Sequence, residues 1–238
     1  IVRGSRVKYD FSNIQRLFLW WKEPNTTGVY VDLDLSTIYF DEEWRELGQT
    51  SYTNLKSSVA VHSGDITSAP NGACEFIDID IEKAKQQKIR YIAMNVYSYS
   101  MIPFTELPEC FAGWMQRNDG QSGEIFDART VEHKFDLTSN SKTCMPFVID
   151  LETNEMIWLD MSVSNKGFTN NVEHNRNIIA LLAESLSTNY KHNLYDLFEM
   201  NGLSRGEIVS NVEEADLVFS PTGDVTPFDV DKIIGEYM

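Results

Sequence analysis

Cysteine is scarce in this chain, and its distribution excludes two kinds of covalent scaffold. Cys74, Cys110 and Cys144 are far apart and odd in number, and none has a cysteine or histidine partner at zinc-binding spacing. This usage argues against a disulfide framework and a structural zinc site. It favours reduced thiols, so we expect a cytoplasmic protein. Because no activating neighbourhood is recognisable, each thiol is predicted to be buried.

Positive charge is also in short supply. The chain has 20 lysines and arginines against 36 aspartates and glutamates, a formal net charge of −16. A field of that sign repels phosphate backbones and anionic lipid headgroups at long range, so we expect no nucleic-acid partner. A cation or a basic protein surface suits it better. We therefore expect a protein partner that presents a basic surface.

Long apolar runs are missing too. No segment approaches the roughly 20 apolar residues that cross a bilayer, and no secretory signal opens the chain. We therefore expect no membrane insertion. Because the chain begins with Ile1 instead of methionine, we expect either that residues were removed or that it is the C-terminal part of a longer polypeptide.

The common catalytic and nucleotide-binding signatures are absent. There is neither a Gly-x-x-x-x-Gly-Lys-Ser/Thr motif nor a Gly-x-Gly-x-x-Gly motif after a strand. His62 precedes Ser63, but no acid stands at a diagnostic spacing, so we predict a packed or turn-capping histidine and no triad. The sequence thus predicts a protein that is not an enzyme.

What the sequence does contain is a strong period of two from Ile14 to about Met161. This pattern, with frequent turn residues, is typical of an antiparallel β-sandwich. Residues 89–99 are apolar on both faces and predict a central strand, and residues 151–154 predict a hairpin turn. Trp44, within the charged segment 41–46, is the tryptophan expected nearest the surface. The predicted strands span residues 14–21, 28–35, 74–81, 89–99, 129–138, 145–150 and 155–161.

Near Lys166 the period becomes helical. Residues 172–186 and 194–200 predict helices, the second ended by Asn201-Gly202, and the segment is rich in acids. The apolar stripe of the first helix predicts docking on the sandwich, with contact to a partner as the alternative. The predicted organisation is a mainly β protein, with a β-sandwich over residues 1–165 and an acidic, mostly helical C-terminal extension over 166–238.

Carboxylates gather around one predicted strand. Asp32 and Asp34 share one face of residues 28–35, while Asp65 and Glu75 lie in and after the following loop. Carboxylates that converge at a strand edge are how calcium acquires its six to eight oxygen ligands. Surface turns favour the same residue types, so the pattern alone leaves both interpretations open.

Four short segments follow one another in the sequence: Tyr30-Val-Asp-Leu-Asp-Leu-Ser, Tyr52-Thr-Asn-Leu, Val61-His-Ser-Gly-Asp65 and Glu75-Phe-Ile-Asp-Ile-Asp. In this order they resemble the TerD-type family of tellurium-resistance and stress-response proteins. The resemblance covers roughly residues 10 to 162 and implies a calcium-binding β-sandwich. It implies that the metal ligands are Asp32, Asp34, Asp65 and Glu75.

The chain departs from the family pattern at the metal motif. Ala73 and Cys74 stand where the family has paired aspartates, and Ile66 replaces a polar residue. The loss of two carboxylates lowers both charge and coordination number, so we expect calcium binding to be weak or lost.

The function predicted is a non-enzymatic, intracellular stress-response module of the tellurium-resistance type, acting in binding or as a scaffold. The alternative is a carbohydrate-active hydrolase, or a carbohydrate-binding sandwich, that uses the acidic loop edge. Two carboxyl groups about 5 to 10 Å apart across a cleft would favour hydrolysis, whereas convergence on one point would favour a cation.

Overall fold

The structure, a computed structural model, describes residues 3–11, 14–26, 28–117, 131–162, 179–181, 184–185 and 194–238. The chain divides into two units, Ile1–Asn189 and Tyr190–Met238. The predicted boundary between residues 165 and 166 lies outside the described residues and stays a prediction. The same holds for most of the helix predicted over residues 172–186.

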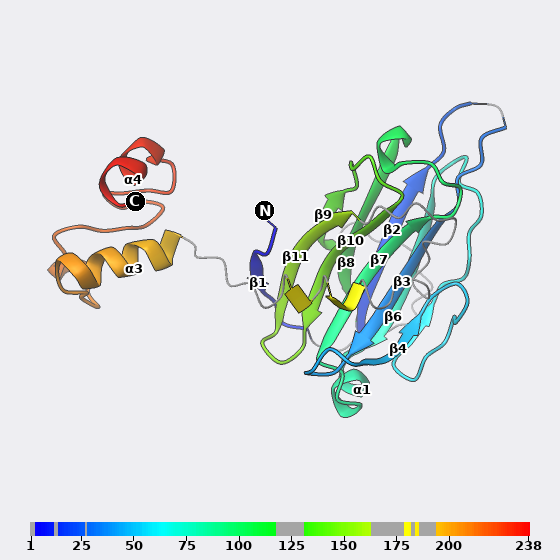
Figure 1. The fold of residues 1–238 in the computed structure, drawn as a ribbon, viewed down its shortest axis with the longest axis horizontal. Helices are drawn as coiled ribbons and strands as arrows, with labels where there is room; N and C mark the ends of the chain where they lie inside the picture. Colours follow the sequence, from blue (N-terminus) through cyan, green and yellow to red (C-terminus); the bar gives the residue numbers. More distant parts are fainter. Residues whose placement is uncertain are drawn as a thin grey trace. The chain divides into compact units, whose positions relative to one another are not determined.

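The first unit consists of two antiparallel sheets whose inner faces share one core (Figure 1). The six-stranded sheet has the order β1-β11-β10-β7-β3-β4, and the five-stranded sheet has the order β5-β6-β2-β8-β9. This architecture confirms the predicted β-sandwich. The strands of the first sheet are β1 (Arg6–Lys8), β11 (Glu155–Ser162), β10 (Thr143–Asp150), β7 (Tyr91–Ser98), β3 (Leu33–Phe40) and β4 (Glu46–Thr50). Those of the second are β5 (Ala60–His62), β6 (Ala73–Asp80), β2 (Ile14–Lys22), β8 (Glu109–Arg117) and β9 (Val131–Asp136).

Alternating apolar side chains build the core between the sheets. Leu19 and Trp21 of β2 face Leu33 and Leu35 of β3, and all four are fully buried. Burial of a side chain of this size contributes about 1.5–3 kcal/mol. The predicted central strand is confirmed, since β7 pairs with both β10 and β3 and is buried along its whole length. The predicted hairpin is confirmed as β10–β11.

Strand β3 differs from its predicted span. The regular ladder starts at Leu33 instead of residue 28 and continues to Phe40. It extends that far because the outer face of this sheet carries a second apolar cluster, which includes Phe40 and Ile179. The prediction for Trp44 was wrong for the same reason: its ring is buried in this cluster and stacks on Tyr91, with 3.9 Å between ring centroids.

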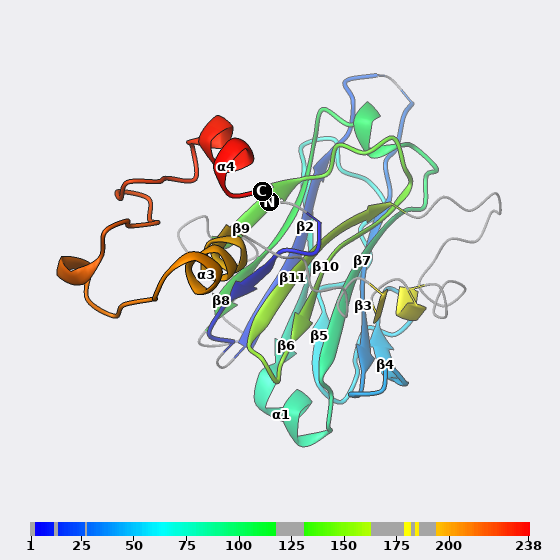
Figure 2. The same cartoon turned by 60° about the vertical axis from the view of Figure 1, so that its left-hand side comes forward.

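One end of the sandwich is closed by a short helix, α1 (Ile81–Gln86). Asp80 caps it, because its Oδ1 accepts a hydrogen bond from the Lys83 amide at 3.0 Å. Residues that lead into β3 lie at the other end of the sandwich, as both views show (Figure 2). The register agrees, since Phe40 pairs with Tyr91, next to α1, and Leu33 pairs with Ser98.

The second unit contains α3 (Leu194–Arg205), the 3-10 turn η3 (Val212–Glu214) and α4 (Val230–Glu236). Phe198 stacks on Phe219 at 4.2 Å between ring centroids, and Tyr237 lies edge-on to both. The predicted stop at Asn201-Gly202 was wrong. Asn201 donates through Nδ2 to the carbonyls of Leu197 and Tyr237, and the helix runs on to Arg205. None of the described helices is long and apolar enough to cross a membrane.

Candidate metal centre

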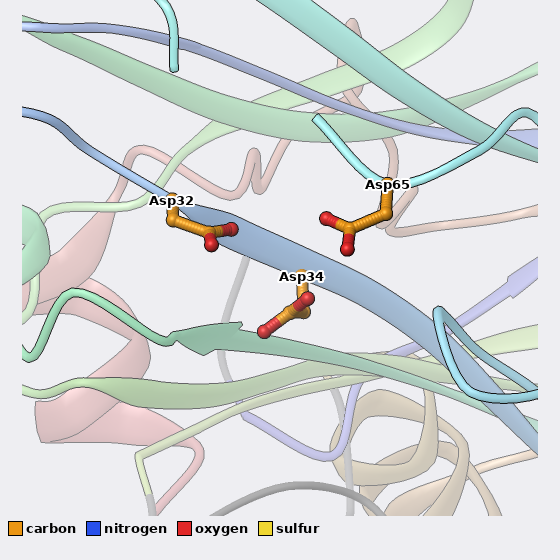
Figure 3. Close-up of side chains that lie close together, drawn as sticks. All are labelled: Asp32, Asp34 and Asp65. Carbon is orange, nitrogen blue, oxygen red and sulfur yellow. The ribbon is translucent and has the colours of Figure 1, made fainter. Parts of the chain in front are cut away.

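Three aspartates from two different parts of the chain converge at the end of the sandwich away from α1. Asp32 and Asp34 come from the start of β3 and its lead-in, and Asp65 comes from the loop 63–72 between β5 and β6. One carboxylate oxygen from each lies within 4.8 Å of the others. In Figure 3 the carboxylates of Asp32 and Asp65 face each other, and the Asp34 side chain lies close to both. The structure thus brings together three of the four predicted ligands.

The strand and the loop reach this point by different backbone devices. The alternation of an extended chain puts Asp32 and Asp34 on one side, opposite the buried Leu33. In the loop, Gly64 has φ of 117°, a conformation that favours glycine, and it turns the chain immediately before Asp65. Burial falls from Asp34, which is 4% exposed, through the half-buried Asp32 to the exposed Asp65. The site therefore opens to solvent on the side of Asp65.

Asp32 has a firmly held backbone and one carboxylate oxygen that no described residue contacts by a hydrogen bond. Its amide donates to Ser100 Oγ at 2.6 Å, and its carbonyl accepts from the Tyr99 amide at 3.0 Å. Its Oδ1 is buried and has no hydrogen-bond partner within the described part of the chain. Burial and the nearby charge of Asp65 raise the pKa of Asp32 to about 6. A cation at this point would supply the compensation that the carboxylate lacks.

Glu75, the fourth predicted ligand, has a different environment. Its side chain is fully buried, with Oε2 accepting from the Leu35 amide and Oε1 from the Ile66 amide, each at 2.9 Å. Burial raises the pKa of Glu75 to about 8, although both N–H donors act to lower it. This carboxyl group is engaged with backbone on both sides of the aspartate cluster.

Ala73 and Cys74, at the start of β6, contribute no oxygen ligand through their side chains. Cys74 lies on the outer face of β6 with Phe18 and Met115, and burial raises its pKa to about 12. Ala73 packs against the core between the sheets. Cys110 and Cys144 are buried as well, so the predicted buried thiols are confirmed.

His62 is a packed, turn-capping residue, as predicted. Its Nδ1 accepts from the Gly64 amide at 3.0 Å, so Nε2 carries the proton and donates to the Leu35 carbonyl at 3.0 Å. Burial lowers its pKa, in keeping with a neutral ring. Ser63 Oγ accepts from the Phe76 amide at 2.9 Å. These contacts use both ring nitrogens on backbone and form no Ser-His relay.

Glu23 is a buried residue at this end of the sandwich that sequence reasoning missed. Its Oε1 accepts from the amides of Val31 at 3.0 Å and Ala69 at 2.6 Å, and its own amide donates to the Ala69 carbonyl. Burial acts to raise its pKa, but these hydrogen bonds and one from Ser68 lower it below its usual value. In the sequence, Glu23 stands beside Pro24 in what is recognisable only as a turn.

The donor set defines what the centre can do. Carboxylate oxygens with solvent access suit a hard divalent cation, and calcium completes its six to eight ligands with carbonyls and waters. Fold and site together therefore define an antiparallel β-sandwich with a three-aspartate cluster at one end.

A solved structure with this fold is that of a homologue of the telluride resistance protein TerD from Streptomyces coelicolor A3(2). The TM-score is 0.51 at 8% identity, over 64% of this chain and 91% of that chain. A second, a protein of unknown function, has a TM-score of 0.47 at 10% identity, over 63% of this chain and 92% of that one. No family model and no curated protein matches the sequence. The chain has a TerD-like fold.

Proposed function

We propose that this chain is a non-enzymatic binding module of the tellurium-resistance type that takes up one divalent cation, calcium, at Asp32, Asp34 and Asp65. The observation that carries the proposal is the convergence of three carboxylates, one of which, Asp32, has a buried Oδ1 with no hydrogen-bond partner among the described residues. Calcium would neutralise these charges and tie the loop 63–72 to the start of β3. The role that follows is to present this loop to a protein partner in the cytoplasm.

Calcium affinity is expected to be low. Three aspartates supply fewer charged oxygens than a full calcium site, and neither Ala73 nor Cys74 adds one. Affinity falls with the number of charged ligands, which places the dissociation constant on the order of 10⁻⁴ M. Waters would fill the remaining positions. Such a site responds to calcium changes in the upper micromolar range.

The hydrolase alternative has less support in this geometry. A glycosidase needs two carboxyl groups that flank a scissile bond, about 5–9.5 Å apart. Here one carboxylate oxygen from each of three aspartates lies within 4.8 Å of the others, which suits joint ligation of an ion.

Thermal unfolding in calcium tests the proposal. At 10 mM calcium, about a hundredfold above the expected dissociation constant, stabilisation should be about 2.7 kcal/mol. For a unit of this size that corresponds to a rise in Tm of roughly 5–10 °C. Asp34→Asn should abolish the rise, while Asp136→Asn, at an exposed carboxylate on β9, should keep it. An unchanged Tm of the wild-type protein at 10 mM calcium would contradict the proposal.

A further inference from the structure

Two buried glutamates hold the aspartate-bearing segments together, and neither is needed as a ligand to do so. The segment 31–35 pairs through its strand with β7, in the six-stranded sheet. The loop 63–72 connects two strands of the five-stranded sheet. Between these segments, the carboxyl groups of Glu75 and Glu23 accept amide N–H groups from both sides.

Glu75 makes the bridge closest to the cluster. One of its oxygens accepts from Leu35, which follows Asp34, and the other accepts from Ile66, which follows Asp65. A single side chain therefore fixes the backbone next to one strand aspartate and next to the loop aspartate.

Glu23 makes the second bridge, before the aspartates of the segment 31–35 and later in the loop. Its Oε1 accepts from Val31, which precedes Asp32, and from Ala69 in the loop. In the segment 31–35 the two bridges flank the aspartates, at residues 31 and 35, and in the loop both follow Asp65, at residues 66 and 69.

We infer that Glu75 and Glu23 are positioning residues for the cation centre, which set the distance between the Asp65 carboxylate and the carboxylates of Asp32 and Asp34. This inference rests on the proposed function for its effect on calcium, but the bridges themselves are a property of the metal-free protein. Glu75 thus acts through the backbone of the site, in place of the ligand role that its motif position implies.

The two bridges should respond differently when the glutamate is replaced by glutamine. A carboxyl group accepts hydrogen bonds at both oxygens, whereas a carboxamide accepts at one and donates from the other. Glu75 uses a separate oxygen for each segment, so Glu75→Gln must release one of them. Glu23 uses the same oxygen for both, so Glu23→Gln can keep both bonds.

Calcium titration calorimetry on the full chain tests the inference. We expect Glu75→Gln to weaken calcium binding at least fivefold and Glu23→Gln to stay within twofold of the wild-type protein. Ile157→Ala, on β11 and separated from β3 by β10 and β7, is the control for lost stability and should bind calcium normally. Unchanged affinity in folded Glu75→Gln would overturn the inference.

Amide hydrogen exchange without calcium separates this inference from the proposed function. Glu75→Gln should speed exchange at Leu35 or Ile66 at least tenfold, while Glu23→Gln leaves Val31 and Ala69 protected. If the wild-type protein binds no calcium, the proposed function fails, and this exchange pattern still decides whether the bridges exist. If Glu75→Gln does not fold, a comparison of Glu23→Ala with Glu23→Gln tests the second bridge in the same way. Equal protection of the Val31 and Ala69 amides from exchange in those two variants would overturn the inference.

Discussion

The strand and the loop that supply the aspartates are held in place by different forces. Asp34 lies in β3, whose backbone is paired with β7 from Leu33 to Phe40 and whose inner face is packed in the core. Asp65 lies in a loop whose amides at Gly64, Ile66 and Ala69 are bound by side chains. The strand half of the centre therefore depends on the whole sandwich, and the loop half depends on a few buried polar groups.

The largest effect should come from damage to the strand side. Leu33→Ala removes a fully buried side chain beside both strand aspartates and should lower the free energy of unfolding by about 2–5 kcal/mol. Urea unfolding measures this loss. A loss below 1 kcal/mol would show that β3 does not anchor its half of the site.

Damage to the loop side should be smaller and local. Glu23→Ala removes the acceptor of the Val31 and Ala69 amides, and a water in the volume that the carboxyl group leaves can replace part of it, so the total cost should be about 1–3 kcal/mol. Limited proteolysis should then cut within residues 63–72 before the sandwich unfolds. Cleavage elsewhere first would contradict the local character of the loop.

Asp32 should make both the stability of the protein and its calcium affinity depend on pH. Its pKa is about 6 in the folded protein, against about 3.9 in an unfolded chain, so the folded state binds more protons between these values. On account of this group, the metal-free protein loses stability as pH rises from 4 toward 7. Calcium needs the ionised carboxylate, so calcium affinity should rise over the same interval. Asp32→Asn should make the stability profile less steep and leave the contribution of Glu75, whose pKa is raised to about 8, as urea unfolding at a series of pH values would show.

The smallest effect is expected at the lead-in to β3. Ser100→Ala removes the hydroxyl that accepts the Asp32 amide at 2.6 Å, which should cost about 0.5–1.5 kcal/mol. Calcium affinity should fall by less than threefold, because Tyr99 still holds the Asp32 carbonyl. A larger loss of affinity would mean that this single hydroxyl, and not the strand, positions Asp32.

Periodicity predicted the sandwich because a strand that is buried on one face has an apolar residue at every second position. It put Asp32 and Asp34 on a common face and identified β7 as central. It misplaced Trp44 because the outer face of the six-stranded sheet is also apolar, and the covering residue Ile179 is remote in sequence. The order of the short motifs added Asp65 to the predicted ligands. Periodicity could not predict that this loop residue lies close to β3.

The bridging contacts of Glu23 and Glu75 could not be predicted from the sequence. A buried Glu23 or Glu75 is indistinguishable from an exposed one until the backbone N–H groups that surround it are known. The motif placed Glu75 among the predicted ligands, but its two oxygens accept hydrogen bonds from the amides of Leu35 and Ile66. Such bridges depend on the packing of one sheet against the other, which local residue types do not encode.

The central claim, that strand and loop aspartates form one cation centre, is tested most directly by a double-mutant cycle on calcium binding. Calorimetry would compare the wild-type protein with Asp32→Asn, Asp65→Asn and the double variant. If both carboxylates hold the same ion, each single change should weaken binding at least tenfold, and the double variant should lose less than the sum of the two free-energy changes. Normal calcium binding by Asp65→Asn would contradict the account.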